Sequence, residues 1–564
     1  ILDGQPSSSS LSNGAANAPA QISLTDCLAC SGCVTSAEAV LVSLQSHNEV
    51  LSVLDSAPAL TLDTTTTSSS SSSVPTISNL SDPNSKLFVA SVSPQTRASL
   101  AAACGNRITS AQAGNMIQQL FRGPAGLASG GKHHNGFTWV VDTNTAREAC
   151  LVLGSEEVLG SQSSPSSSLI PINKPTSPIL TSSCPGWVCY AEKTHPYVLP
   201  HLSRTKSPQA LMGTLLKTTL SKTLNISPDR IWHLAIMPCF DKKLEASREE
   251  LTDAVWSSEG DGKPGKGIRD VDCVITSKEI LMLAASRGID FFSLSTEASS
   301  LPPQPVFPDR TIQDFLFPTH TANNKRQPRL QQTPDAGTSG GNLHYILHDV
   351  QSRNPGSQIQ TIRGRNADVI DYAVVSASGE TVFKAARYYG FRNIQNLVRK
   401  LKPAKASRMP GGKPFGGARK PVGKSSGLEY AYVEVMACPG GCTNGGGQIK
   451  VDDQAVMERR GLVEEKKPGP NEQKAWLAEV DEAYFSADEQ RPDQDADTDV
   501  PEFVAGISPS YIRDTLSHWA EITSIPLDRL VYTSYREVVS DVGKKPISDT
   551  ERVVQLAGKI GGGW

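Results

Sequence analysis

Two cysteines at the end of an apolar run constrain this chain more than any other feature. Residues 430–437 form a largely apolar run that predicts a buried strand, and the run ends at Cys438, with Cys442 four residues later. Five glycines follow between residues 440 and 447. Glycine allows positive φ angles, so this backbone could wrap closely around a ligand and direct N–H groups at sulfur. The stretch therefore predicts an iron–sulfur cluster site at a strand end.

Two further apolar runs also end in a cysteine. Residues 179–184 end at Cys184, and the predicted strand at residues 231–237 is followed by Pro238 and Cys239. In an open α/β sheet, ligands collect at the carboxyl ends of strands, so these cysteines could converge with the pair described above. Four thiolates are the number that a cubane cluster requires.

The pattern of apolar runs and helix signals predicts an α/β body, because strands and helices alternate along the chain. Ser207 and Pro208 form a helix start with an N-cap and a proline at the first helical position. Cys273 falls inside a strand and is expected in the core. Strands are predicted at residues 87–92, 137–142, 231–237, 271–276, 367–375 and 430–437, and helices at residues 94–103, 208–220, 278–287, 344–351, 383–402 and 511–525.

A second cysteine cluster lies near the N-terminus, where Cys27, Cys30 and Cys33 form a C-x2-C-x2-C run. This spacing is typical of ferredoxin-type loops that bind a four-iron cluster. A zinc knuckle or plain buried thiols are the alternatives. Residues 34–55 contain no fourth cysteine, and the chain begins with Ile1 rather than methionine. The missing ligand is therefore expected either among the isolated downstream cysteines or upstream of Ile1, in a segment that this sequence lacks.

Composition narrows the class of protein. The formal net charge of the 564 residues is -3, which gives no reason to expect bulk binding to nucleic acid or to acidic membranes. No apolar run reaches the roughly 18 residues of a membrane span, and no signal segment is present, so we expect a soluble, non-secreted protein. The 11 cysteines are odd in number and sparse. They favour a reducing compartment with metal-bound thiolates over a disulfide scaffold.

The segments between the motifs suggest a domain order. A basic, Pro/Gly-rich stretch could be a nucleic-acid or localisation tail, but a surface insertion fits the neutral overall charge better. We expect an N-terminal cysteine module at 1–50, a Ser/Thr-rich linker at 51–85, one lobe at 86–300, a second lobe at 301–465 with the basic insertion at 402–427, an acidic mobile segment at 466–505 and a C-terminal segment at 506–564.

Three of these motifs resemble the signature motifs of iron-only hydrogenases. They are Thr-Ser-Ser-Cys-Pro-Gly-Trp at residues 181–187, Met-Pro-Cys-Phe-Asp-Lys-Lys-Leu-Glu at 237–245, and Val-Met-Ala-Cys-Pro-Gly-Gly-Cys-Thr-Asn-Gly-Gly-Gly-Gln at 435–448. The resemblance runs from about residue 87 to residue 539. Within that superfamily the chain most resembles the eukaryotic cytosolic iron–sulfur protein assembly factors, which are related to nuclear prelamin A recognition factor. Members of this group carry an N-terminal segment similar to residues 24–33.

The resemblance implies a fold and two cofactors. The fold would be α/β, a two-lobed iron-only hydrogenase-like body with parallel sheets, preceded by a small ferredoxin-like cysteine module. One 4Fe-4S cluster would be held by Cys184, Cys239, Cys438 and Cys442. A second 4Fe-4S cluster would be held by Cys27, Cys30 and Cys33, with a remaining ligand that in the family lies upstream of this triplet.

The residue before Cys184 separates a hydrogenase from an assembly factor. Hydrogenases carry a motif similar to Thr-Ser-Cys-Cys-Pro, where the first cysteine relays protons to a di-iron unit; here that position is Ser183. A serine hydroxyl has a far higher pKa than a thiol at roughly 8.5, so it is a poor proton shuttle. Lys242 and Glu245 are retained at positions that surround the di-iron unit in hydrogenases, but they could equally form a structural ion pair. The resemblance therefore implies a cluster-binding protein without hydrogenase activity.

The resemblance also implies a role and partners. The protein would link the scaffold P-loop NTPase complex to the targeting complex, which includes a WD-repeat protein, during maturation of cytosolic and nuclear 4Fe-4S proteins. Trp564 resembles the terminal aromatic residue by which some proteins engage that complex, and an ordinary frayed end is the alternative. The alternative functions are a catalytic iron-only hydrogenase and a lamin-associated cluster-binding protein. The expected location is the cytoplasm, with the nucleus left open, and no membrane or direct nucleic-acid partner is expected.

Overall fold

The computed structural model describes most of the chain from residue 42 onward. Cys27, Cys30 and Cys33 lie outside the described residues, as do most of the basic insertion and Trp564. Among the described residues, no helix is both long and apolar enough to cross a membrane. The described ranges are 42–63, 76–105, 108–160, 174–257, 265–318, 333–402, 429–460, 468–486 and 503–538.

The first sheet has four strands in the order β4-β3-β6-β7, and every pair is parallel. Its strands are β3 (Leu87–Val92), β4 (Trp139–Asp142), β6 (Ile231–Met237) and β7 (Cys273–Thr276). Every residue of β3 and β6 is buried. Continuous apolar runs are what a parallel strand covered on both faces requires, which explains why the sequence predicted these strands.

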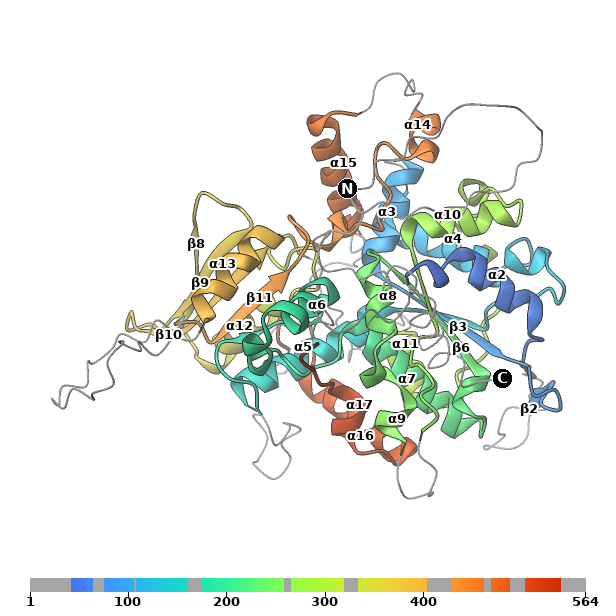
Figure 1. Ribbon diagram of the computed structural model, residues 1–564, viewed down its shortest axis with the longest axis horizontal. Helices are drawn as coiled ribbons and strands as arrows, with labels where there is room; N and C mark the ends of the chain where they lie inside the picture. The colour runs from blue at the N-terminus through green and yellow to red at the C-terminus, as the bar shows by residue number, and fades with distance from the viewer. Residues whose placement is uncertain are drawn as a thin grey trace, which may run out of the picture.

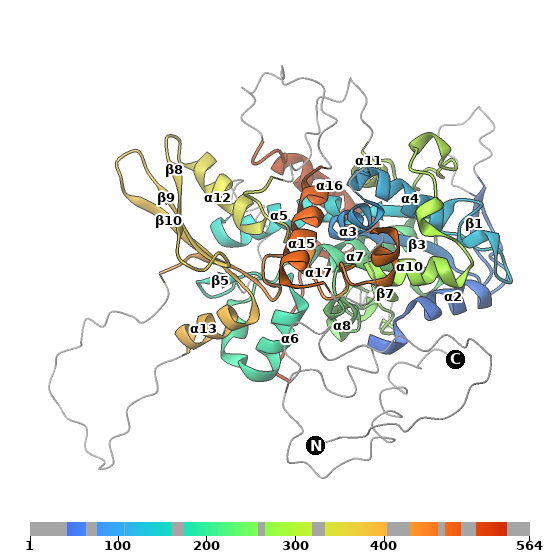
Figure 2. The ribbon, with the colours of Figure 1, turned by 90° about the horizontal axis from the view of Figure 1, so that it is seen from above.

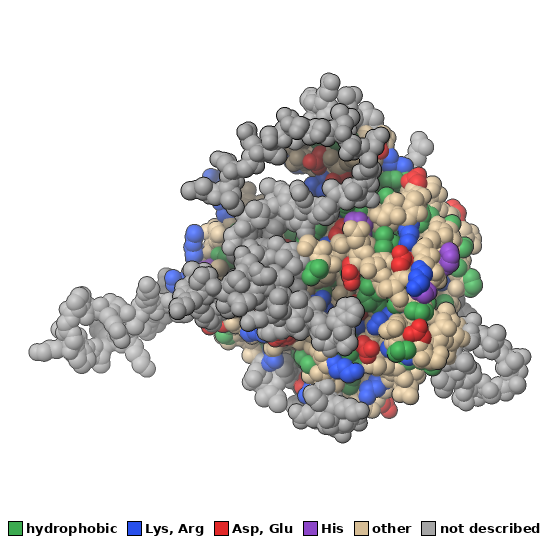
Figure 3. Space-filling view, turned by 45° about the vertical axis from the view of Figure 1, so that its right-hand side comes forward, with side chains coloured by type: hydrophobic (Ala, Val, Ile, Leu, Met, Phe, Trp, Pro, Cys, Tyr) green, Lys and Arg blue, Asp and Glu red, His purple; other side chains and the backbone are tan. Residues whose placement is uncertain are grey.

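Helices cover both faces of the first sheet (Figures 1 and 2). Phe88 and Ala90 of β3 pack into one core and Leu87 and Val89 into the other, because successive side chains of a strand point to opposite faces. The first core includes residues of α2 (His47–Ser56), α3 (Pro94–Cys104), α4 (Ser110–Arg122) and α10 (Ser277–Ser286). The second includes residues of α5 (Thr143–Leu159), α7 (Pro208–Thr223) and α16 (Pro509–Thr523). Figure 3 shows acidic and basic side chains interspersed on the outer surface.

The second sheet has five strands in the order β5-β11-β10-β9-β8. Strand β11 (Tyr432–Met436) pairs in parallel with β5 (Ile179–Leu180) on one side and with β10 (Thr381–Tyr389) on the other. Strand β9 (Val369–Val375) pairs antiparallel with β10 and with β8 (Gln358–Arg363). Helix α12 (Asn342–Arg353) packs on one face and α13 (Phe391–Leu401) on the other. The expectation of parallel sheets therefore holds for the first sheet and for only one side of the second.

The predicted helix at residues 383–402 is wrong over its first part. Residues 383–389 belong to strand β10, and the helix α13 begins only at Phe391. Ala385 packs with α12, whereas Ala386 and Tyr388 pack with α13. The alanines gave this segment helical propensity, but pairing with strands on both sides and burial of both faces override it.

Two expected segments also differ from the structure. Helix α15 (Pro470–Phe485) lies within the segment predicted to be acidic and mobile, so that prediction is wrong for these residues. Trp476, Val480 and Tyr484, spaced four residues apart, are buried in the first core. Strand β5 joins the second sheet although it lies within residues 86–300, which were assigned to the first lobe. The other domain limits stay a prediction.

Candidate metal centre

Four cysteines follow strands from both sheets. Cys239 lies two residues after the end of β6 in the first sheet. Cys438 and Cys442 follow β11 of the second sheet, and Cys184 follows β5 and is the N-cap residue of α6 (Pro185–Thr194). The site therefore lies where strand ends of the two sheets meet.

The four thiols lie close enough together to influence one another. Burial and the neighbouring Cys442 raise the pKa of Cys184 to about 12. Burial also raises the pKa of Cys239 and Cys438, and in both the other cysteines of the group contribute. The influence between charges falls with distance, so these thiols lie near one another. The structure thus brings together the four cysteines that the sequence singled out.

The arrangement suits a group larger than a single ion. Within the described ranges, no three His, Cys, Asp or Glu side chains are grouped so that they could hold one metal ion. A cubane needs one thiolate at each of its four irons, so an all-cysteine set of this kind fits a 4Fe-4S cluster.

The glycines after Cys438 have two different tasks. Gly440 and Gly441 have φ angles of 75° and 119°, which favour glycine at the turn between the two cysteines. Gly445 and Gly447 serve close packing instead. A Cβ on Gly445 would lie 2.3 Å from the carbonyl oxygen of Pro238, and the Gly447 N–H donates to the same oxygen at 3.0 Å. The glycines therefore fix this loop against the strand end that carries Cys239.

Sequence reasoning missed several residues around the cysteines. The Ala437 N–H donates to the Sγ of Cys184 at 3.3 Å, and the Cys442 N–H donates to the Oγ of Ser339 at 3.1 Å. Thr443 donates to the carboxylate of Asp481 at 2.6 Å, so α15 lies against the cysteine loop. Only the tertiary structure places the loop at Ser339 beside Cys442.

Lys242 and Glu245 form the ion pair that the sequence left open. Their charged atoms lie 2.8 Å apart, and the Lys242 Nζ also donates to the Ser183 carbonyl and the Ser207 hydroxyl, each at 3.1 Å. Burial would lower the pKa of Lys242, but the carboxylate of Glu245 reverses this effect and raises it. The pair holds the backbone directly before Cys184.

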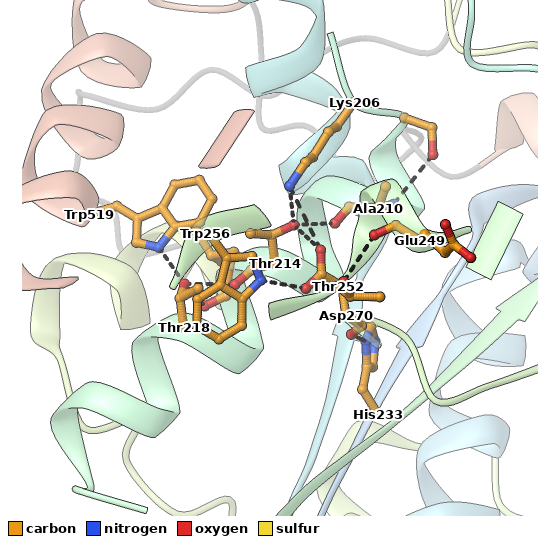
Figure 4. A network of polar contacts seen from close by, with 12 residues as sticks. Lys206, Ala210, Thr214, Thr218, His233, Glu249, Thr252, Trp256, Asp270 and Trp519 are labelled. Atoms are coloured by element: carbon orange, nitrogen blue, oxygen red, sulfur yellow. Dashed lines mark hydrogen bonds and ion pairs between the residues drawn. The ribbon is translucent and has the colours of Figure 1, made fainter. Parts of the chain in front are cut away.

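A second buried ion pair lies deeper in the first lobe (Figure 4). The Lys206 Nζ lies 3.7 Å from the carboxylate of Asp270 and donates to the Thr214 hydroxyl at 2.8 Å. Trp256 Nε1 donates to the same carboxylate at 2.7 Å. Burial lowers the pKa of Lys206, and Asp270 opposes this effect. The charges are matched, so this network stabilises the start of α7 behind the cysteine site.

Two of the remaining described cysteines lie elsewhere. Cys273 is 1% exposed within β7, which confirms its predicted place in the core. Cys150 is buried in α5 and donates to the Lys206 carbonyl at 3.2 Å. Neither thiol is among the principal influences on the pKa of the four clustered cysteines.

Comparisons with known proteins agree on one family. Residues 86–446 match the family model described as iron only hydrogenase large subunit, C-terminal domain. The cytosolic Fe-S cluster assembly factor NAR1 of Chaetomium globosum is 73% identical over 566 aligned positions, which cover 100% of this chain and 92% of that protein. The cytosolic Fe-S cluster assembly factor nar-1 of Neurospora crassa is 69% identical, with the same coverage.

Solved structures of low sequence identity share the fold. A variant of the [FeFe]-hydrogenase HydA1 from Chlamydomonas reinhardtii superimposes with a TM-score of 0.52 at 20% identity, covering 81% of this chain and 96% of the other. An apo form of the same hydrogenase, in another variant, gives a TM-score of 0.51 with the same identity and coverage. At this identity the likeness concerns the fold alone.

Proposed function

Because the chain belongs to the family of cytosolic Fe-S cluster assembly factors with an iron-only hydrogenase domain, we propose that it takes part in cytosolic Fe-S protein assembly through a buried cluster. The observation that carries the proposal is the grouping of four cysteines that follow strand ends of the two sheets and influence one another's pKa. The proposed ligands of this inner 4Fe-4S cluster are Cys184, Cys239, Cys438 and Cys442.

The residues around the thiols support a stable site. The backbone N–H of Ala437 is directed at one proposed ligand sulfur, and the glycine loop is fixed against the strand end that carries another. Burial holds the free thiols protonated, so cluster binding must release protons and should weaken as the pH falls. When bound, the cluster supplies a one-electron redox centre.

Hydrogen turnover is not part of the proposal. Ser183 stands where the hydrogenase motif has a proton-relaying cysteine, and a hydroxyl is a poor relay at neutral pH. All three protons of the Lys242 ammonium are donated to protein acceptors. Both observations favour a body that keeps the cluster without hydrogenase activity.

A second cluster is proposed at the N-terminus. Cys27, Cys30 and Cys33 have the spacing of a four-iron loop, and the family resemblance places a further ligand upstream of this triplet. A full-length protein would then bind two 4Fe-4S clusters, or about eight iron atoms.

The proposed role is to link the scaffold P-loop NTPase complex with the WD-repeat-containing targeting complex. The names of the relatives support an assembly role in the cytosol, and the nucleus is a second proposed location. Neither partner surface is assigned, so the role rests on family membership.

The role is tested by depletion and complementation. Depleting the protein should lower the activity of cytosolic and nuclear Fe-S enzymes. Wild-type protein and a Cys104→Ala control should restore the activity, whereas Cys438→Ala should not. Enzymes that keep their clusters after depletion would contradict the assembly role. Infrared bands of carbonyl and cyanide ligands in anaerobically isolated protein would instead indicate a hydrogenase.

A further inference from the structure

A cavity of about 80 Å³ lies beside Cys442, between the first lobe and the loop before α12. Its lining includes the cations Arg147 and Lys242 but no aspartate or glutamate. An unmatched positive charge in such a cavity favours an anionic ligand.

Only one of the two cations is unmatched. Lys242 is paired with Glu245, and its three protons are donated to partners in the protein. Arg147 in α5, by contrast, is buried, with only 6% of its surface exposed. It forms no ion pair with any described residue. A guanidinium stays protonated in proteins, and a buried charge is costly unless a counter-ion accompanies it.

The donors of Arg147 indicate the shape of that counter-ion. Its Nη1 donates to the Tyr484 hydroxyl at 3.1 Å, whereas Nε and Nη2 are buried and have no partner within the described ranges. These two atoms form one edge of the guanidinium and donate in parallel. Such an edge matches two oxygens of an oxyanion better than a single-atom anion.

Two acceptors in the lining also have no partner among the described residues. They are the Oε1 of Gln209 and the Oδ1 of Asn144. The orientation of Gln209 is fixed, because its Nε2 donates to the Lys242 carbonyl and to the Glu245 carboxylate. Each buried acceptor requires a donor, so the ligand should carry two hydroxyl groups as well as anionic oxygens.

The proposed cluster is a poor candidate for the counter-ion of Arg147. Lys242 is among the charges that shift the pKa of Cys239 and Cys442. Arg147 is not among the principal influences on any of the four thiols. The thiols therefore respond to the charge of Lys242 more than to that of Arg147.

We propose that this cavity binds one small oxyanion carrying two hydroxyl groups, of the size of dihydrogen phosphate. Arg147 is its counter-ion through Nε and Nη2, and Gln209 and Asn144 each accept from one of its two hydroxyl groups. The site is independent of whether the cluster is transferred to other proteins.

Binding of inorganic phosphate to the full-length, cluster-loaded protein tests the proposal by titration calorimetry. Arg147→Met should raise the Kd for phosphate at least tenfold, because methionine fills a similar volume but lacks the positive charge and the two donors Nε and Nη2. Arg353→Met is the matched control, since Arg353 is paired with Asp349 outside the cavity, and its Kd should equal that of the wild type. Sulfate, which lacks a hydroxyl at neutral pH, should bind at least tenfold more weakly than phosphate.

A second measurement does not depend on folding of the variant. Crystals of the wild-type protein grown with arsenate should show an anomalous arsenic peak within hydrogen-bonding distance of the Arg147 Nε and Nη2. A cavity that contains only water under these conditions would overturn the proposal. Equal phosphate affinity of wild type and Arg147→Met would also overturn it, and equal affinity for sulfate and phosphate would overturn the hydroxyl assignment.

Discussion

The two sheets differ in how they are built but meet at the same site. The first sheet is parallel throughout, and its strands β3 and β6 are buried at every position. The second is parallel only next to the cysteines; beyond β10 it continues as an antiparallel extension whose edge strand β8 has five of six positions exposed. The parallel parts of both sheets supply the cysteines. The extension supplies none.

Buried charge is also handled differently in the two lobes. The first lobe contains buried ion pairs such as Lys206–Asp270 and Lys243–Glu279. In the second sheet, Glu434 is buried and accepts from the Tyr389 hydroxyl at 2.6 Å and the Leu343 N–H at 2.9 Å, both neutral donors. Burial raises the pKa of Glu434. The first lobe therefore depends more on matched charges than the second sheet does.

The largest expected effect is loss of the inner cluster from either sheet. Cys239→Ala in the first lobe and Cys438→Ala in the second should each remove about four of the iron atoms bound per chain. Iron and acid-labile sulfide analysis measures this, with Cys104→Ala as the control that keeps its iron. If Cys239→Ala kept its full iron content, the first sheet would not contribute to the site.

The next largest effect concerns the ion pair in the first lobe. Asp270→Ala leaves the buried Lys206 without a counter-charge and should lower the free energy of unfolding by about 3–5 kcal/mol. Urea unfolding measures the change. Lys384→Ala removes an exposed partner from an ion pair of the second sheet and should change the urea midpoint little. Similar losses in both variants would contradict the difference between the lobes.

A pH-dependent effect is expected at the junction of the two sheets. Glu157 is buried in α5 and accepts from the Ser203 hydroxyl, and the Ser203 N–H donates to the carbonyl of Leu180 in β5. Burial raises the pKa of Glu157 from 4.5 to about 7. The folded state therefore holds this proton more tightly than the unfolded state. The resulting stabilisation is complete below about pH 4.5 and is lost as the pH rises through about 7.

Glu157→Gln tests this effect. The free energy of unfolding of the wild type should fall by up to about 3 kcal/mol between pH 4.5 and pH 7, and the variant should not show this decrease. Urea unfolding at a series of pH values, compared between the two proteins, measures it. Parallel pH profiles would show that Glu157 does not titrate in this range.

The smallest effect comes from one substitution made in both sheets. Ile236→Val in β6 removes a methyl group from a fully buried side chain and should cost about 1 kcal/mol. Ile362→Val in β8 alters a side chain that is 59% exposed and should stay within about 0.5 kcal/mol of the wild type. Thermal unfolding compares the two. Equal losses of stability in the two variants would mean that β8 is buried in solution.

The difference in burial between the two sheets explains which strands could be predicted from the sequence. The limits of β3 and β6 agree with the predicted runs, because strands buried on both faces are continuously apolar. Strand β8 was missed since its residues are mostly exposed and polar, and β10 was mistaken for a helix because its alanines carry no strand signal.

The cysteines of the site could be predicted, but their surroundings could not. Each cysteine follows an apolar run, so a rule about strand ends was sufficient to group them. Arg147 lies within a helix and Asp481 within a segment expected to be mobile, and neither is near a cysteine of the site in the sequence. Their roles follow from contacts between distant segments, which a single sequence does not show.

The most direct test of the inner cluster is a metal analysis of the chain with Cys27, Cys30 and Cys33 all replaced by alanine. After anaerobic reconstitution with iron and sulfide, about four iron atoms and an equal amount of acid-labile sulfide should remain per chain. No bound iron, or a single iron without sulfide, would contradict a 4Fe-4S cluster held by Cys184, Cys239, Cys438 and Cys442.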